Sequence, residues 1–181
     1  MMAGVWGRVD SDTRLGYRRR VRRKFYRMIL CGEREVDAVP PSVNVRRYCA
    51  KRDHEAIRST YGQAFGDPPW PPEWDSFDEF DANGAFVAED ARTGAMVGFA
   101  LCFQRSDYGY ISVVAVTPSH RRQGVAFSLV RRAIRYLRSI GLETVKVDAI
   151  TDAVPAVNLY KKIGFQVEST FEDDDDLPGA R

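Results

Sequence analysis

Residues 116–134, VTPSHRRQGVAFSLVRRAI, join the end of an apolar run to the start of an apolar helical pattern. Between the two lie a proline, His120, Arg121, Arg122 and Gly124. The first turn of a helix has backbone N–H groups without partners and a partial positive charge, so anions bind there. Gly124 has no Cβ and allows a ligand close to the main chain, while arginine side chains match phosphate geometry. The stretch predicts a strand-to-helix junction that holds a phosphate or pyrophosphate.

The local motif, R-x-x-G-x-A at Arg121 to Ala126, is short. A basic turn with one flexible glycine would have the same sequence. On this motif alone, a phosphate-binding loop and a simple basic turn both remain open. The pattern GxxxxGK[ST] of a Walker loop is absent, and only one of the three glycines of a dinucleotide fingerprint is present. Neither of those phosphate-binding loops is therefore predicted.

The rest of the chain alternates between short apolar runs and helical patterns. Strands are expected at residues 42–48, 84–90, 96–104, 110–116, 143–150 and 165–171, and helices at 53–65, from about 73, at 123–140 and at 153–163. Two of the strands, 96–104 and 110–116, are apolar nearly throughout, so both of their faces should be covered. The order β-α-α-β-β-β-α-β-α-β predicts an α/β fold, a mixed sheet with helices on both sides.

The segment from Tyr110 to Phe165 resembles the GNAT superfamily of N-acetyltransferases. The matching pieces are an apolar strand ending in V-x-P, the pattern [QR]-x-x-G-x-[GA] at Arg121 to Ala126, and A-x-x-L-Y-x-x-x-G-F at Ala156 to Phe165. The resemblance extends over about residues 43–171. It implies a GNAT-like fold, with a mostly antiparallel twisted sheet whose central strands splay apart.

The resemblance also implies transfer of acetyl from acetyl-CoA, the co-substrate, to a primary amine of a small molecule, peptide or protein by direct attack in a ternary complex, with no metal. The pyrophosphate would lie on the loop amides and the pantetheine on the first splayed strand. The residues so assigned to acetyl-CoA are Val114, Ala115, Val116, Arg121, Arg122, Gln123, Gly124, Val125, Ala126 and Phe127. An open strand edge offers N–H and C=O groups that pantetheine amides can satisfy. A non-catalytic acyl-CoA-binding or interaction module is the alternative function.

Two residues are candidates for the catalytic proton transfers. Tyr160 matches the position of the family's general acid, and a phenol with a pKa of about 10 can protonate a thiolate whose conjugate acid has a pKa of about 8.5. Packing in the core is the other role open to Tyr160. Asp148 is the first candidate base, with a solvent-facing carboxylate equally open, and Glu89 is the second. The backbone N–H near Val116 is the oxyanion candidate, and Ala153 stands where family members often carry asparagine.

The acceptor pocket is expected between the first two helices, in the segment AFGDPPWPPEWDSFDEF at residues 64–80. Its aromatic residues could wall a pocket and its aspartates could attract a cation: Trp70, Trp74, Phe77, Phe80, Asp67, Asp75 and Asp78. Covering the edge of the core and lying in solvent are the simpler roles for most of them. The sequence does not identify the acceptor.

Charge and hydropathy suggest three segments: a basic N-terminal extension at 1–41, a GNAT acetyltransferase domain at 42–171 and an acidic tail at 172–181. Residues 8–27 hold nine Lys or Arg against two acids. Apolar residues at 17, 21, 25 and 29 predict an amphipathic helix that docks on its own domain or on a second subunit, which would give a homodimer. Binding to an anionic membrane or to nucleic acid is the alternative, and nothing else in the chain suggests a nucleic-acid partner.

The overall composition is that of one soluble domain. The chain has 181 residues, a net charge of +2, and 44% hydrophobic and 29% charged residues. No apolar run approaches the roughly 20 residues of a membrane span, and no secretory signal is recognised at the N-terminus. The three cysteines have no metal-ligand spacing, so reduced thiols and a cytoplasmic location are expected.

Overall fold

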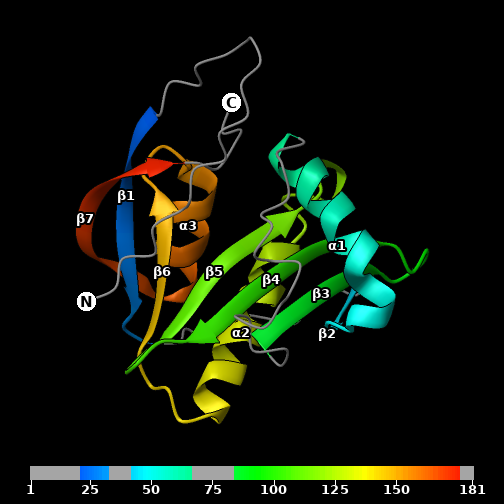
Figure 1. The fold of residues 1–181 in the computed structure, drawn as a ribbon, viewed down its shortest axis with the longest axis horizontal. Coiled ribbons are helices and arrows are strands. Elements are labelled where there is room, and N and C mark those ends of the chain that lie inside the picture. The colour runs from blue at the N-terminus through cyan, green and yellow to red at the C-terminus, as the bar shows by residue number, and fades with distance from the viewer. Residues whose placement is uncertain (1–20, 33–41, 67–83, 176–181) are drawn as a thin grey trace, which may run out of the picture.

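Every described strand belongs to one twisted sheet (Figure 1). The computed structural model describes residues 21–32, 42–66 and 84–175. The strands are β1 (Val21–Leu30), β2 (Val43–Arg47), β3 (Ala85–Asp90), β4 (Met96–Gln104), β5 (Gly109–Val116), β6 (Val145–Ile150) and β7 (Phe165–Asp175). Their spatial order is β2-β3-β4-β5-β6-β1-β7, and all neighbours are antiparallel except β5 and β6. The expected mixed, mostly antiparallel sheet is confirmed.

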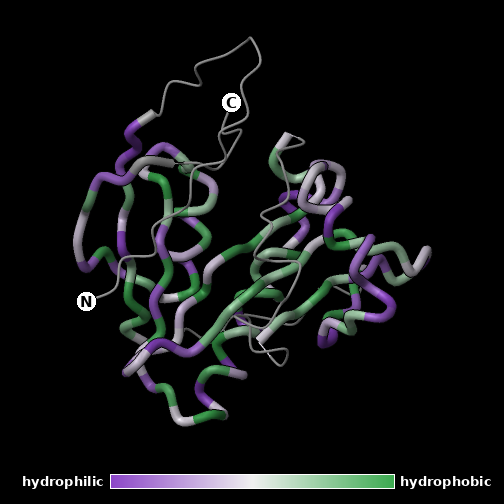
Figure 2. The backbone as a smooth tube through the Cα atoms, in the orientation of Figure 1, coloured by the Kyte–Doolittle hydropathy of each residue, from purple (hydrophilic) through white to green (hydrophobic). Residues whose placement is uncertain are grey.

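Helices cover both faces of this sheet. Helix α1 (Ala50–Phe65) lies on one face, and α2 (Val125–Ser139) and α3 (Val154–Ile163) lie on the other (Figure 1). α1 packs Ile57 and Tyr61 against β3, β4 and β5. The core on the other face contains the predicted apolar stripe of α2: Leu129, Val130, Ala133, Ile134 and Leu137. Figure 2 shows β4 and β5 hydrophobic over much of their length, as strands covered on both faces should be. Of the helices in the described part of the chain, none has the length and apolar character to cross a membrane.

Strand β1 lies inside the sheet, between β6 and β7, so the helix predicted across residues 17–29 is wrong from Val21 onward. An apolar spacing of four fits a helix, but it is also a multiple of the two-residue period of a strand. Residues outside this spacing are buried as well, since Met28 and Leu30 lie in the core with residues of α3. The sheet therefore includes residues N-terminal to position 42, where the domain was expected to begin.

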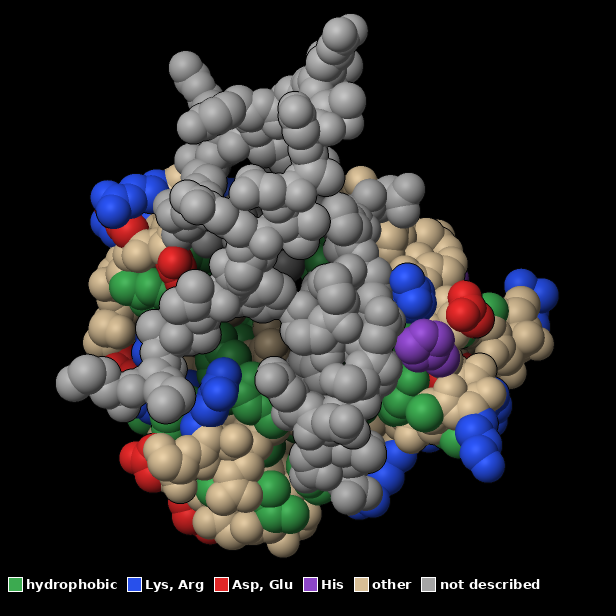
Figure 3. Space-filling model, in the orientation of Figure 1, with side chains coloured by type: hydrophobic (Ala, Val, Ile, Leu, Met, Phe, Trp, Pro, Cys, Tyr) green, Lys and Arg blue, Asp and Glu red, His purple; other side chains and the backbone are tan. Residues whose placement is uncertain are grey.

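The basic run of β1 and the acidic run of β7 pair with each other. The register of β1 and β7 places opposite charges across from one another at two pairs, Arg23 with Asp173 and Lys24 with Glu172. Figure 3 shows basic and acidic side chains side by side at the upper left, over this ribbon. Exposed ion pairs add little stability, so the charges mainly favour the correct strand pairing. The acidic tail expected from residue 172 is part of the sheet as far as Asp175.

The burial of Met28 gives a direct test of β1. Met28→Ala should lower the free energy of unfolding by about 2–5 kcal/mol, because its fully buried side chain would leave a cavity. Arg22→Ala on the same strand should change it by less than about 0.5 kcal/mol, because Arg22 is exposed. Urea unfolding of both variants measures the difference, and equal stability of the two would contradict the place of β1 in the core.

The centre of the sheet opens between β5 and β6. Parallel pairing joins residues 109–111 of β5 to residues 145–147 of β6 and then stops, and the two strands diverge (Figure 1). At the same level the register of β4 with β5 shifts, which makes Ser112 an extra residue with no counterpart on β4. A β-bulge of this kind bends its strand and increases the local twist. The bulge and the end of pairing together produce the expected splay.

Candidate functional site

The loop from β5 to α2 contains two residues in the left-handed conformation. After the short 3₁₀ turn η3 (Pro118–His120), Arg122 has φ 63° and Gly124 has φ 83°. α2 begins directly afterwards, at Val125. Left-handed residues in a turn can direct successive N–H groups into one concave array, which binds anions. Gly124 adopts this conformation without the penalty that a Cβ brings.

The amides of residues 122–127 have no hydrogen-bond acceptor among the described residues. The first amide of this segment that is taken belongs to Ser128, which donates to the Gly124 carbonyl at 3.0 Å. Unpaired amides at the positive end of a helix are the donors that an anion needs. The loop residues assigned to acetyl-CoA thus present the main-chain groups that would suit a pyrophosphate.

Arg121 and Arg122, assigned the same role, are placed differently. The Arg121 guanidinium donates from Nε to the Val116 carbonyl at 3.2 Å and from Nη2 to the Ala64 carbonyl at 2.7 Å. Arg121 therefore links the loop to the ends of β5 and α1. Arg122 is exposed, so its charge is available beside the unpaired amides.

The strand residues assigned to acetyl-CoA lie along the open side of β5. Val114, Ala115 and Val116 follow the bulge, where β5 no longer pairs with β6. Ala115 packs toward α1, whereas Val114 and Val116 pack toward α2. Their side chains are thus used for packing, and the main-chain edge remains to bind an extended ligand with amide groups.

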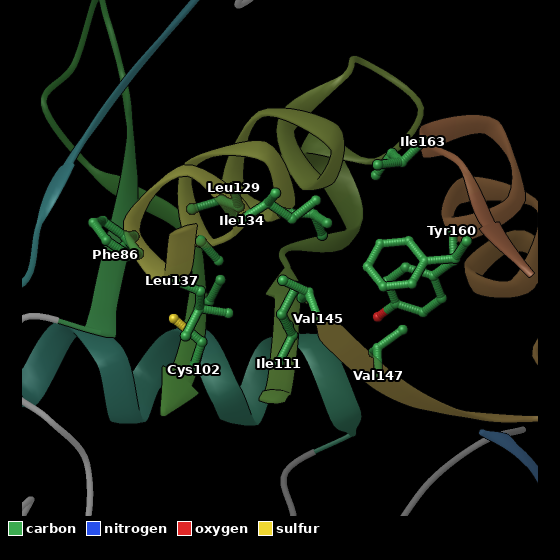
Figure 4. Close-up of a cluster of buried hydrophobic side chains, with 14 of the residues drawn as sticks. Phe86, Cys102, Ile111, Leu129, Ile134, Leu137, Val145, Val147, Tyr160 and Ile163 are labelled. Carbon is green, nitrogen blue, oxygen red and sulfur yellow. The ribbon is translucent and has the colours of Figure 1, made fainter. Parts of the chain in front are cut away.

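Tyr160 lies on α3 with its ring in the core and only 6% of its surface exposed. Its ring lies edge-on to the Phe165 ring, with 5.7 Å between the two ring centres. Figure 4 shows its hydroxyl near Val147 of β6, the last β6 residue that pairs with β5. No described residue hydrogen-bonds this hydroxyl, and burial raises its pKa above the ordinary value. The hydroxyl therefore keeps its proton at neutral pH and has hydrogen-bonding capacity to spare.

Asp148 is the first β6 residue beyond the pairing with β5, and it is held by two other strands. Arg27 of β1 donates from Nε to Oδ1 at 3.0 Å and from Nη2 to Oδ2 at 2.9 Å. The Tyr110 hydroxyl of β5 donates to Oδ2 at 3.0 Å. Sequence reasoning missed Arg27 and Tyr110, because residues separated by up to 121 positions leave no local signal.

Tyr160 and Asp148 lie on opposite faces of the sheet. Along β6, Val145, Val147 and Ala149 are buried on the face of α3, and Asp148 lies on the alternate face. Both residues lie near the point where the pairing of β5 with β6 ends. A thioester held in the opening would have a proton donor on one side and a carboxylate on the other, which is an arrangement suited to acyl transfer.

The other titratable candidates are engaged elsewhere. Glu89 of β3 accepts from the Arg46 guanidinium, which also binds both oxygens of buried Asp53. His120 lies near the loop with Nε2 3.5 Å from Asp90 Oδ2. Strand β4 also separates Glu89 from β5 in the sheet.

Two further sequence expectations concern the ligands. Ala153 is the residue before α3 and makes no side-chain cap hydrogen bond. An alanine side chain has no hydrogen-bonding group, so it cannot make the pantetheine contact that the family resemblance implies for asparagine at this position. The acceptor-pocket residues expected within 67–80, and the helix expected from about residue 73, lie outside the described residues.

The sequence of this chain is similar to a known family and to curated proteins. The family model described as "Acetyltransferase (GNAT) family" matches residues 54–165. A mycothiol acetyltransferase from Saccharomonospora viridis is 32% identical over 152 residues, which are 73% of this chain and 48% of that protein. One from Mycobacteroides abscessus is 31% identical over 146 residues, with the same two shares. The chain spans about half the length of the curated relatives it matches.

Solved structures share the fold. A GCN5-related N-acetyltransferase from Sphaerobacter thermophilus has a TM-score of 0.71 at 23% identity, over 83% of this chain and 50% of that chain. A chain of the NatC complex bound to Gag peptide and CoA has a TM-score of 0.61 at 20% identity, over 69% and 85%. With the family model matching well over half of its residues, the chain belongs to the GNAT acetyltransferase family.

Proposed function

We propose that this protein transfers the acetyl group of acetyl-CoA to a primary amine. The observation that carries the proposal is the opening between β5 and β6, with unpaired loop amides at one end and the Tyr160 hydroxyl beside it. The amides of residues 122–127 would bind the pyrophosphate, and the edge of β5 at residues 114–116 would bind the pantetheine. This arrangement directs the thioester toward the vertex of the splay, the point at Ile111 and Val147 where the pairing of β5 with β6 ends.

The residues around the vertex supply the proton transfers. The acceptor arrives as an ammonium ion and loses one proton to Asp148, directly or through water, which frees the lone pair that forms the C–N bond. The C–S bond then breaks, and the departing thiolate takes the proton of the Tyr160 hydroxyl. The amide nitrogen releases its second proton to solvent, from which Tyr160 is reprotonated. The products are an N-acetylated amine, a free thiol and one proton.

The oxyanion of the tetrahedral intermediate needs a main-chain donor near the vertex. The N–H near Val116 is the sequence candidate, but Val116 is paired with Gly98 of β4 at the far end of the strand. The bulge at Ser112 lies at the vertex itself. We therefore assign the oxyanion contact to the main chain around Ser112, and Val116 to binding the pantetheine.

The names of the relatives suggest which amine acceptors to test first. The curated relatives are named mycothiol acetyltransferases, so a mycothiol-type amine belongs in a panel of acceptors. Amino-terminal peptides belong there too, since one solved neighbour carries a bound peptide. The chain matches only half of each curated relative, so the panel is kept broad.

A thiol-release assay over this panel tests the proposed function. We expect acetyl-CoA-dependent thiol release with at least one primary amine, and an N-acetylated product of the corresponding mass. If calorimetry shows acetyl-CoA binding but no amine in the panel gives thiol release, the non-catalytic acyl-CoA-binding module is supported instead. The alanine at position 153, where family members often carry asparagine, is a reason to keep that alternative. Absence of acetyl-CoA binding would contradict both functions.

A further inference from the structure

We propose that Arg27 of β1 is a positioning residue for acetyl transfer. It holds the Asp148 carboxylate in the orientation needed to accept a proton from the acceptor amine. The inference rests on the proposed function. Arg27 lies outside residues 54–165, the segment matched by the family model, so the family pattern does not contain it. It reaches the site because β1 is inserted next to β6, with Arg27 directly across from Asp148.

The first argument is a count of hydrogen bonds. A carboxylate offers about four lone-pair positions. Within the described part of the chain, three of those of Asp148 are taken, two by the Arg27 guanidinium and one by the Tyr110 hydroxyl. With respect to these residues, one position remains for the ammonium group of an acceptor or for a bridging water. The two donors thus determine the direction in which Asp148 can accept a further proton.

The second argument is the rigidity of the Arg27 side chain. Its guanidinium lies 5.0 Å from the centre of the Phe171 ring, and that ring stacks on Phe25 at 5.3 Å. Planar stacking together with two hydrogen bonds to one carboxylate leaves little rotational freedom. The hydrogen bond to Asp148 also raises the pKa of the guanidinium, whose charge is therefore constant. A lysine could supply the charge but not the planar fork.

The third argument is that nearby charges are already paired. Lys146 lies on the same face of β6 as Asp148, and its ammonium group contacts both oxygens of Glu168 at 2.8 Å. Lys146 is thus occupied by Glu168 and does not compete for Asp148. With 14% of its side chain exposed, Asp148 is mostly buried but retains some accessible surface for a ligand.

The test is a double-mutant cycle on the full chain with an acceptor identified by the amine panel. Arg27→Gln should lower kcat/KM for the acceptor by about tenfold, less than the hundredfold that a 1 Å misplacement of a reacting group can cost. The affinity for acetyl-CoA, measured by calorimetry, should stay within twofold. In the Asp148→Asn background, Arg27→Gln should have no further effect, because it acts through that carboxylate. Arg27→Lys should restore part of the loss.

Arg22→Gln is the matched control, since it removes the same charge from the same strand at an exposed position and should leave kcat/KM unchanged. If Arg27→Gln fails to fold by circular dichroism, the cycle is run with Arg27→Lys. Additive losses in the cycle, or full acceptor kcat/KM in the Arg27 variant, would overturn the role of Arg27 alone. No turnover by the wild-type chain would overturn the proposed function and this role together.

Discussion

Gly124→Asp is expected to abolish acetyl-CoA binding while the sheet stays folded. The new carboxylate would lie at the N-terminus of α2, among the unpaired amides of residues 122–127. Two like unit charges 4 Å apart near a protein surface repel by about 4 kcal/mol. That energy corresponds to a loss of affinity on the order of 1,000-fold, which calorimetry would register as no detectable binding.

Two controls separate charge, size and backbone conformation. Aspartate and asparagine both tolerate the left-handed conformation of Gly124, so Gly124→Asn adds the same bulk without the charge and should cost only about tenfold in affinity. Gly141→Asp places the same charge on a left-handed glycine with open space around it, at the other end of α2. That variant should bind acetyl-CoA normally. Unchanged affinity in Gly124→Asp would show that the loop is not the pyrophosphate site.

Tyr160→Phe should lower kcat by roughly 100-fold, the lower range for a lost proton donor, and leave acetyl-CoA affinity within a few-fold. The phenyl ring keeps the edge-on contact with Phe165, so packing in the core is preserved. Only the hydroxyl near Val147 is removed. Single-turnover measurements of acetyl transfer would isolate the chemical step from product release.

The pH profile provides a second measurement on Tyr160. Burial raises the pKa of this hydroxyl above the ordinary 10.0, so it remains protonated throughout the range below about pH 10. Wild-type kcat should therefore show no alkaline decline from this group below that pH. Tyr136→Phe removes another buried phenol hydroxyl, on α2, and should leave kcat unchanged. An unaltered single-turnover rate in Tyr160→Phe would leave Tyr160 as a packing residue.

The elements around the loop are predictable because their signals are local. The helix predicted at 123–140 spans 125–139, and the strand predicted at 143–150 spans 145–150. Each is specified by an apolar period and a terminating residue within a few positions. β1 lacks such a signal, since its spacing of four suits a helix and a strand equally. Its character is decided by pairing with β6 and β7, whose residues lie more than a hundred positions downstream.

The same distinction applies to the site. The loop residues and Tyr160 belong to sequence motifs, and the structure places them beside one opening. Asp148 is visible in the sequence only as an acid in an apolar strand, and its hydrogen bonds to Arg27 and Tyr110 follow from strand order alone. The bulge at Ser112 depends on the pairing register of β4 and β5, and the side-chain pattern of β5 does not predict it.

The insertion of β1 between β6 and β7 determines when the protein can finish folding during translation. β2 to β5 each pair with the strand next in sequence, so they can assemble as they leave the ribosome. β1 is made before all of them, yet both of its neighbours in the sheet are made after β5. Until then Met28 and Leu30 have no sheet to cover them, and the strand edges stay open to other chains. A nascent chain stalled before residue 165 would thus present an aggregation-prone strand to chaperones, rather than a smaller functional enzyme.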